Sequence, residues 1–510
     1  MLAPLTILLA ALAAPPAGGE ALQPIEVAPG VFVLAFSDRH ASANAGWVTG
    51  GGEVTLIGAP DAESVPAILD AVRKTTGKAP SSAIITGASP RAFEAARRLL
   101  AEGVSRGVVA AGAPGKDALS ATAAGPPVEA VRARTLLTRA GRELELVPFD
   151  RGPGTSALAV HVRDCGVLFT GEACVHGPRA VLRGTSTAAW IRALRELRRL
   201  QPELVVPGAG TTGGRDLIDR QERLLLELRR QVGHRVAQGW PAELVSAGVR
   251  IEPEWLVWMP YDTPTREDVD HVRDELTIPR APFGADPFRD EETGSKTLAI
   301  IGDSPHEPGH LEAGLAPVFE AAGLAVRFAV DFRALSKETL AQVRLLILLR
   351  DGNSWPEGPD RPTRPWMTIE QERAVVEFVE RGGAFLALHN STGLYPEKGP
   401  YLELLGGTYE GHGPLERFRV RVADADHPVT RGVEEYEIAD EQHTPRPDTS
   451  HVHVILRSIS AEGVEAAAGW VREVGKGRVC YLANGHTRDA LGHPMFRRLI
   501  ANAIGWCLDK

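Results

Sequence analysis

Hydrophobic positions in the first half of the chain fall into short β-type runs and amphipathic helical segments. The runs 30–34 and 53–57 are β-branched and bounded by glycines, which predicts two strands. In the segment 187–200, Trp190 and Leu194 share one helical face, which predicts a helix packed against a core. This mixed order predicts an α/β domain. The other predicted elements are helices at 62–75 and 91–102, and strands at 82–86, 143–147, 157–162, 166–170 and 204–207.

From about residue 296 the pattern changes to apolar strands separated by helices. The runs 297–301 and 345–349 are continuously apolar, which is typical of buried strands in a parallel sheet. Thr368 and Gln371 have the spacing of a capping box, which predicts a helix start there. Ligands of such sheets lie beyond the carboxyl ends of the strands. The other predicted elements are a helix at 311–322, a short helix capped by Ser336, and strands at 325–330, 384–388 and 477–482.

Two segments without core-type periodicity divide the chain. The apolar run 2–14 is followed by small residues and prolines, and it is shorter than the ~20 residues that span a bilayer. It predicts a signal peptide and export to the periplasm or the extracellular space. The segment 261–295 is charged, contains four prolines and reads as a linker. The predicted organisation is a signal peptide at 1–21, a first domain at 22–260, a linker at 261–295 and a second domain at 296–510.

Composition excludes several classes of protein. The 510 residues include 56 Lys and Arg against 65 Asp and Glu, a formal net charge of −9, which argues against a dedicated nucleic-acid binder. Four cysteines exclude a disulfide scaffold and a cysteine-rich zinc module. No later segment is long and apolar enough to predict a membrane span.

Histidines and acids of the second half follow predicted strands or lie near glycines. His389 directly follows the strand 384–388, and His486 follows the strand 477–482. The carboxyl ends of parallel strands meet at one sheet edge, so these side chains are expected to converge. The candidate site residues are Asp303, His306, His310, His389, Asn390, His412, Asp440, Glu441 and His486.

The first half carries the runs GVFVL, VTLIG, IITGASPRAFEAARRLL, VLFTGEA and VVPGAG. Over about 25–235 these resemble the metallo-β-lactamase fold, which implies an αββα sandwich. Active members hold one or two metals with an HxHxDH motif, a later histidine, an aspartate and a last histidine. The resemblance implies that this domain has lost those ligands and is neither a metal site nor a metallohydrolase. The corresponding positions are Gly87, Ser89, Arg91, Ala92, Gly154, Glu172 and Ala209.

The second half carries RGGAFLALHNSTG, YLELLGGTYEGHGP, DHPVTRGV, DEQH and GKGRVCYLANGH. Over about 297–510 these resemble the ThuA-like (trehalose utilisation) family of the class I glutamine amidotransferase-like fold. The resemblance implies a flavodoxin-like, three-layer α/β/α domain with a mostly parallel sheet, and a sugar or sugar derivative as ligand. Where the amidotransferases have a nucleophilic cysteine this chain has His389, and Ser391 could serve only if the turn were displaced. His486 stands where those relatives have a catalytic histidine, with Asp489 nearby.

Two chemistries fit the surviving residues of the second half. Imidazoles with Glu441 could hold one divalent metal, zinc or manganese. Alternatively, His389 or His486 could act without metal as a general base on a polyol. The residues assigned to these roles are, for catalysis, His389, His486 and Glu441; for a metal, His389, His412, Glu441 and His486; and for substrate, Asp303, His306, His310, Asn390, Trp355 and Tyr409.

The leading functional hypothesis is an exported protein whose second domain processes a sugar, as a hydrolase or an isomerase, while the first domain is a scaffold. The alternative is a non-catalytic protein that binds a carbohydrate or a partner through two enzyme folds that have lost their catalytic activity. A homo-oligomer assembled through the first domain is a third hypothesis.

Overall fold

The structure is a computed structural model of the chain. By its packing the chain divides into two compact units: Met1–Leu228 with Arg250–Asp268 form the first unit, and Arg229–Val249 with Val269–Lys510 form the second unit. The predicted signal peptide lies outside the described residues. The structure describes residues 23–36, 43–113, 119, 127–152, 154–176, 182–251, 265–277, 297–359 and 361–509.

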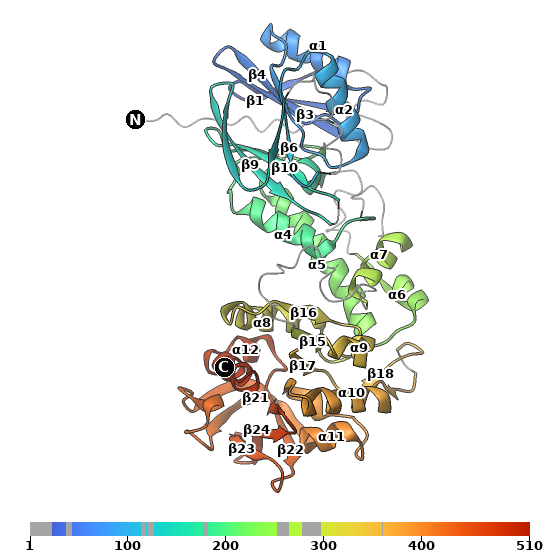
Figure 1. The fold of residues 1–510 in the computed structure, drawn as a ribbon, viewed down its shortest axis with the longest axis vertical. Coiled ribbons are helices and arrows are strands. Elements are labelled where there is room, and N and C mark those ends of the chain that lie inside the picture. Colours follow the sequence, from blue (N-terminus) through green and yellow to red (C-terminus); the bar gives the residue numbers. More distant parts are fainter. Residues whose placement is uncertain are drawn as a thin grey trace. The chain divides into compact units, whose positions relative to one another are not determined.

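The first unit is built on two sheets. The order in the larger sheet is β1-β2-β3-β4-β5-β6-β7, antiparallel up to β4 and parallel from there to β7. Strand β14 pairs with β3, and β12 pairs with β14. The order in the smaller sheet is β13-β11-β10-β9-β8. Figure 1 shows helices α1 and α2 on the outer side of the larger sheet, with α4 beside the other sheet. Buried residues of both sheets, α1 and α2 form one core, which confirms the predicted αββα sandwich.

Seven of the fourteen described strands of the first unit, β2, β4, β5, β9, β10, β11 and β13, lie close to predicted ones, and the other seven were not predicted. Its strands are β1 (Ile25–Ala28), β2 (Val31–Phe36), β3 (Ala43–Gly50), β4 (Glu53–Ile57), β5 (Ser82–Ile84), β6 (Gly107–Ala110), β7 (Val128–Val131), β8 (Thr135–Arg139), β9 (Arg142–Phe149), β10 (Ala157–Val162), β11 (Val167–Phe169), β12 (Val175–His176), β13 (Leu204–Val206) and β14 (Ala209–Gly210). Its helices are α1 (Val65–Thr76), α2 (Pro90–Ala101), the 3-10 turn η1 (Gly171–Ala173) and α4 (Thr187–Arg198), and α5 (Asp216–Ala237) contains the boundary between the units.

The second unit has a three-layer core around a nine-stranded sheet. The order is β16-β15-β17-β20-β25-β24-β23-β21-β22, and the first five strands are parallel. One face packs against α8, α12 and α13, and the other packs against α9, α10 and α11. This confirms the predicted α/β/α layers. The strands of the parallel part are β15 (Thr297–Ile301), β16 (Val326–Ala329), β17 (Leu345–Leu349), β20 (Ala384–Leu388) and β25 (Gly477–Leu482), and the helices are α8 (Pro308–Ala321), α9 (Lys337–Leu340), α10 (Ile369–Glu380), α11 (Pro400–Leu405), α12 (Arg488–Gly492) and α13 (Pro494–Cys507).

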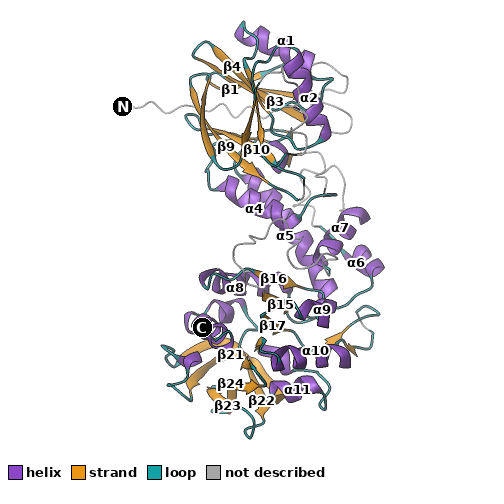
Figure 2. Ribbon diagram, viewed as in Figure 1, coloured by secondary structure: helices purple, strands orange, loops and turns teal. Residues whose placement is uncertain are grey.

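The other four strands extend this sheet in an antiparallel arrangement (Figure 2). They were not predicted, and His412, which the sequence places near glycines, belongs to strand β21. The segment is rich in glycine and charged residues, and much of it faces solvent, so its apolar period is weak. The strands are β21 (Gly407–Val422), β22 (Tyr436–Pro447), β23 (His453–Ile459) and β24 (Glu465–Val474), and a separate hairpin joins β18 (Asn353–Ser354) to β19 (Arg364–Pro365).

Helical segments before residue 297 belong partly to the second unit. Packing places Arg229–Val249 there, although the sequence analysis included it in the first domain. In this segment the Gln238 carbonyl accepts a 2.7 Å hydrogen bond from the Trp355 backbone N–H. The segment includes the end of α5 and helix α6 (Ala242–Gly248). Within the predicted linker, α7 (Arg266–Leu276) is a helix, and most of the rest lies outside the described residues.

No helix in the described parts of the chain combines the length and apolarity needed to cross a membrane.

Candidate functional site

The candidate site of the second unit lies where parallel strands end. His389 directly follows β20 and begins the 3-10 turn η5 (His389–Thr392), and its φ of 49° is in the left-handed region. A non-glycine residue adopts this conformation only where the surrounding structure holds it, and such strain is common at functional sites. The Ser391 hydroxyl donates to the Leu388 carbonyl at 2.6 Å and is fully buried. The turn is therefore not displaced, and His389 occupies the elbow position.

Hydrogen bonding orients the His389 ring. Its Nδ1 lies 3.0 Å from the Ala483 carbonyl, which can only accept, so Nδ1 carries the proton. The Nε2 lone pair then points into the site. That atom is buried and has no hydrogen-bond partner among the described residues.

The loop after β15 supplies His306 and the carboxylate that orients it. Asp303 Oδ1 accepts from the His306 backbone N–H at 2.9 Å and from Nδ1 at 2.6 Å. Asp303 Oδ2 accepts from the Asp351 backbone N–H at 2.8 Å and from Asn390 Nδ2 at 2.5 Å. Asp303 is fully buried, so these four bonds fix both carboxylate oxygens and leave His306 Nε2 facing the site.

The loop after β25 supplies His486, and a second buried carboxylate holds that loop. Asp440 accepts backbone hydrogen bonds from Gly485 at 2.7 Å, His486 at 3.1 Å and Thr487 at 3.2 Å. Burial nevertheless raises the pKa of Asp440 to about 6. Asp440 thus positions His486 through its backbone and is not the acid that contacts the ring.

The long hairpin β21–β22 contributes Glu441 and His443 from one strand face, because side chains two apart point the same way. The His443 ring centroid lies 4.0 Å from that of His389. His412, opposite His443 across the hairpin, lies between two register shifts of β21, and such bulges re-aim a side chain. The Tyr409 ring lies 5.3 Å from His443, at the outer edge of the cluster.

Three imidazoles and one carboxylate converge at distances suited to a metal ion. His306 Nε2 lies 2.9 Å from His486 Nδ1, and Glu441 Oε2 lies 3.2 Å from His486 Nδ1 and 3.9 Å from His389 Nε2. Ligand atoms about 2.0 Å from a tetrahedral zinc are about 3.3 Å apart. His306, His389 and His486 form one group of ligand atoms within 4.8 Å of each other, and His389, Glu441 and His443 form another.

The electrostatics of the cluster favour neutral rings at most positions. Burial lowers the pKa of His389 well below its usual value, and burial together with neighbouring histidines lowers that of His443 to about 3. Burial and His306 lower the pKa of His486. Burial also acts to lower the pKa of His306, but the Asp303 carboxylate more than offsets it, so the net shift is upward. Neutral imidazoles have the lone pairs that a metal needs.

Several predicted residues lie apart from this cluster. His310 is in the first turn of α8, and its backbone N–H donates to Glu307 at 3.0 Å. Trp355 is tied through its backbone to Gln238. Trp366, in the same loop, is buried and packs on Phe332. Asn390 donates from Nδ2 to Asp303, and its predicted contact with substrate stays a prediction.

Sequence reasoning missed His443. The signal was available, because in DEQH this residue is two positions after Glu441, and a strand places both on one face. Without the prediction of β22, that periodicity could not be used. His412, a predicted metal ligand, has a side chain that is 42% exposed and 3.7 Å from Glu441. It borders the cluster, and His306 occupies the more central place.

His443 predicts a pH dependence of stability. Its pKa is about 3 in the folded chain and ~6.5 when unfolded, so between these values the unfolded state binds one more proton. The free energy of unfolding should therefore fall as pH drops below ~6.5, by about 1.4 kcal/mol per pH unit from this residue. His443→Asn should show a shallower fall in chelator-treated protein, measured by denaturant unfolding. Equal slopes for the variant and the wild type would contradict the assignment.

The ligand positions implied by the lactamase resemblance can be located in the first unit. Ser89 accepts the Ala92 N–H at 3.3 Å and caps α2, while Arg91 pairs with Asp61 at 3.0 Å. Among the seven corresponding positions, Glu172 alone has a side chain that commonly binds zinc. One carboxylate cannot build a site of three or four ligands, so the residues present do not fit the metal of that fold.

Comparisons with known proteins assign a family to each unit. Residues 301–507 match the ThuA family, trehalose utilisation, and residues 65–209 match the metallo-beta-lactamase superfamily. No curated protein matches the chain.

The similar solved structures include both metallo-beta-lactamases and ThuA-like proteins. A metallo-beta-lactamase from Pontibacter korlensis is 15% identical over 40% of this chain and 98% of its own, with a TM-score of 0.35. A ThuA-like protein from Parabacteroides merdae is 17% identical over 42% of this chain and 90% of its own, with a TM-score of 0.36. Another, from Bacteroides uniformis, is 18% identical over 43% and 93%, with a TM-score of 0.34. The two family models, and not these structures, identify a metallo-beta-lactamase superfamily domain at 65–209 followed by a ThuA domain at 301–507, a family associated with carbohydrate utilisation.

Proposed function

We propose that the second unit binds one divalent metal, zinc or manganese, and uses it to process a sugar or sugar derivative. The observation that supports a metal most directly is the convergence of His306 Nε2, His389 Nε2 and His486 Nδ1 in a largely buried cluster. Lone pairs aimed at one another in a buried space are unfavourable unless a cation lies between them. Because His389 keeps an unpartnered Nε2, a proton shared between His306 and His486 alone does not account for the arrangement.

The three histidines are the proposed ligands, and Glu441 is the proposed acid–base residue. A bound divalent ion would polarise a substrate oxygen as a Lewis acid. Glu441 has a side chain that is 19% exposed, so a substrate hydroxyl can reach its carboxylate, which would accept and return the proton. Asp303 holds the His306 ring, and Asp440 holds the backbone of His486. Tyr409 and His412 would border the bound sugar, with the tyrosine ring as an apolar platform.

The ThuA match supports carbohydrate as the substrate class, whereas hydrolysis or isomerisation is left to experiment. The first unit would act as a scaffold or docking domain. Export, which the N-terminal sequence suggests, would place the reaction in the periplasm or outside the cell.

Turnover and metal content together test this function. Purified full-length protein, loaded with zinc or manganese, would be incubated with trehalose, glucose and other sugars and followed by NMR. Glu441→Gln should retain the metal yet lose turnover at least ~10²-fold, because the proton acceptor is gone. The matched control is Glu410→Gln, an exposed acid of the same hairpin that pairs with Arg446 at 3.0 Å, and it should keep full activity.

Other outcomes separate the competing functions. Sugar binding without turnover would favour the non-catalytic binding protein. Turnover in chelator-treated protein would favour metal-free acid–base catalysis. A concentration-dependent mass with no sugar binding would favour an assembly role.

A further inference from the structure

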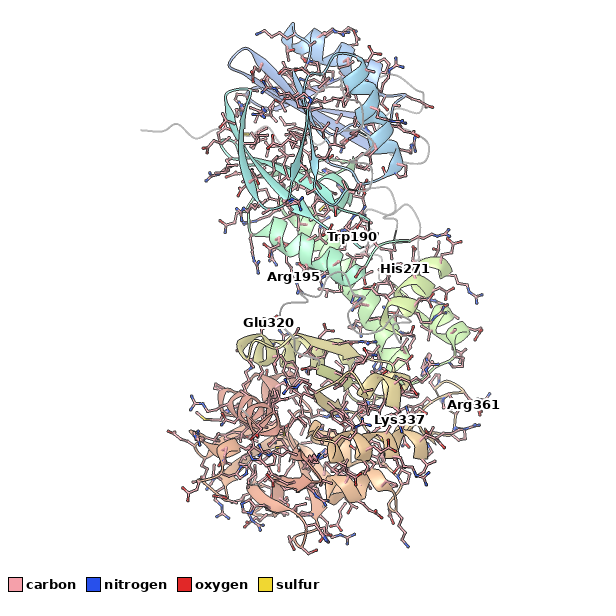
Figure 3. The ribbon with its side chains drawn as sticks, in the orientation of Figure 1. Trp190, Arg195, His271, Glu320, Lys337 and Arg361 are labelled. Carbon is pink, nitrogen blue, oxygen red and sulfur yellow. The ribbon has the colours of Figure 1, made fainter. Side chains whose placement is uncertain are left out.

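A buried guanidinium lies in the first unit, at the end of β9. Arg151 is 9% exposed, and its Cζ lies 4.5 Å from the ring centroid of Trp190. Trp190 belongs to α4 and is labelled in Figure 3. The Arg151 backbone N–H donates to Thr155 Oγ1 at 2.9 Å. The arginine therefore belongs to the packed interior of this end of the sandwich.

Its partner is Glu172, in the turn η1 after β11. Arg151 Nη2 forms an ion pair with Glu172 Oε2. The other carboxylate oxygen, Oε1, accepts the Ala88 backbone N–H at 3.2 Å. Glu172 thus connects the loop after β5 to the arginine, and the arginine connects to α4 through Trp190.

The positions that correspond to lost metal ligands surround this pair. A Cβ added at Gly87 would lie 2.9 Å from Glu172 Oε1. A Cβ added at Gly208, beside Ala209, would lie 3.3 Å from the Glu172 backbone nitrogen. Gly154 is three residues after Arg151 on the same loop. The guanidinium therefore stands among strand ends that would each supply a ligand in a metal-binding relative.

We propose that Arg151 replaces the metal of this fold: its permanent charge holds Glu172, and through it the loops after β5, β9 and β11, without any ion. A guanidinium stays protonated at all physiological pH values and presents several donors in one plane. It supplies a positive charge opposite the Glu172 carboxylate, whose side chain is 29% exposed, while the arginine itself is the buried member of the pair. The first unit consequently folds independently of metal.

Removal of either partner should be costly, and removal of both should be mild. An unpaired buried charge is strongly destabilising, whereas replacing a whole buried pair by apolar residues is often neutral. In the full chain, Arg151→Ala should lower the Tm of the first unit by about 10 °C and speed hydrogen–deuterium exchange over residues 157–173. Arg151→Met combined with Glu172→Met should recover most of that loss, which keeps the test decisive if the single variant folds poorly.

The control is the more exposed pair of Arg134 with Glu145 in the same unit, where the arginine side chain is 58% exposed. Arg134→Ala should shift the Tm by no more than about 3 °C, because the arginine lies mostly in solvent and Glu145 keeps His161 as a second partner at 3.5 Å. Equal effects of Arg151→Ala and Arg134→Ala would overturn the proposal.

A metal titration tests the other half of the inference. It uses full-length His389→Ala/His486→Ala protein, which lacks the candidate ligands of the second unit. Excess zinc should leave its exchange over residues 157–173 unchanged, and elemental analysis after desalting should find no bound zinc. Zinc bound at one per chain with slower exchange over this segment would show that the first unit still takes a metal.

Discussion

Replacing His389 and His486 together by alanine is expected to abolish divalent-metal binding by the full chain. Each contributes one of the three converging nitrogens, and a zinc site in a protein needs at least three protein ligands. Elemental analysis of wild-type protein, purified without a chelator or a histidine tag, should find close to one zinc or manganese per chain. Elemental analysis of the double variant should find almost no zinc or manganese.

The matched control is His451→Ala in the same unit. That histidine is 63% exposed and bonds to Asp448 at 2.7 Å, apart from the cluster, so its loss should leave the metal content unchanged. Metal that survives the double substitution would contradict the ligand assignment. A wild-type chain that binds no metal even after reloading would contradict the metal proposal and favour acid–base chemistry by the histidines alone.

Replacing Asp303 by asparagine should weaken metal binding about 10- to 100-fold, although Asp303 touches no metal in the proposed site. The two Asp303 oxygens accept four hydrogen bonds. In the asparagine variant the amide NH₂ group would replace one of these oxygens and would face N–H donors that it cannot accept from. The His306 ring would lose its fixed tautomer and orientation, and therefore part of its basicity. Competition against a chelator of known affinity measures the change.

Asp489→Asn is the control for that variant. Asp489 is an exposed acid in the first turn of α12, three residues after His486 in the sequence. The loop of His486 is held by Asp440. The control should bind metal as the wild type does. Equal losses in Asp303→Asn and Asp489→Asn would contradict a specific role for Asp303.

The parallel core of the second unit was predictable because each strand is apolar on both faces. The runs 297–301, 345–349, 384–388 and 477–482 coincide with β15, β17, β20 and β25. The capping box of Thr368 and Gln371 also forms as predicted, since it depends on residues three positions apart. Local spacing decides such features before the chain folds.

The antiparallel extension was less predictable because its strands lie partly in solvent. Glycine and charged residues weaken the apolar alternation in β21, so no strand was predicted for this segment. The pairing of β21 with β22 was therefore not predicted either, although this pairing brings Glu441 and His443 to His389. The predicted αββα sandwich was confirmed. The Arg151–Glu172 pair within it was not predicted, because the two residues are 21 positions apart and no spacing rule connects them.

The sequence by itself determined the two domain families and the strand ends that carry His389 and His486, because these follow from residue type and local order. Only the tertiary structure decided which side chains share the site. It brought His306 and His443 into the cluster and assigned Asp303 and Asp440 to supporting roles. These choices depend on hydrogen bonds and ring contacts between segments up to 180 residues apart, which no local pattern encodes.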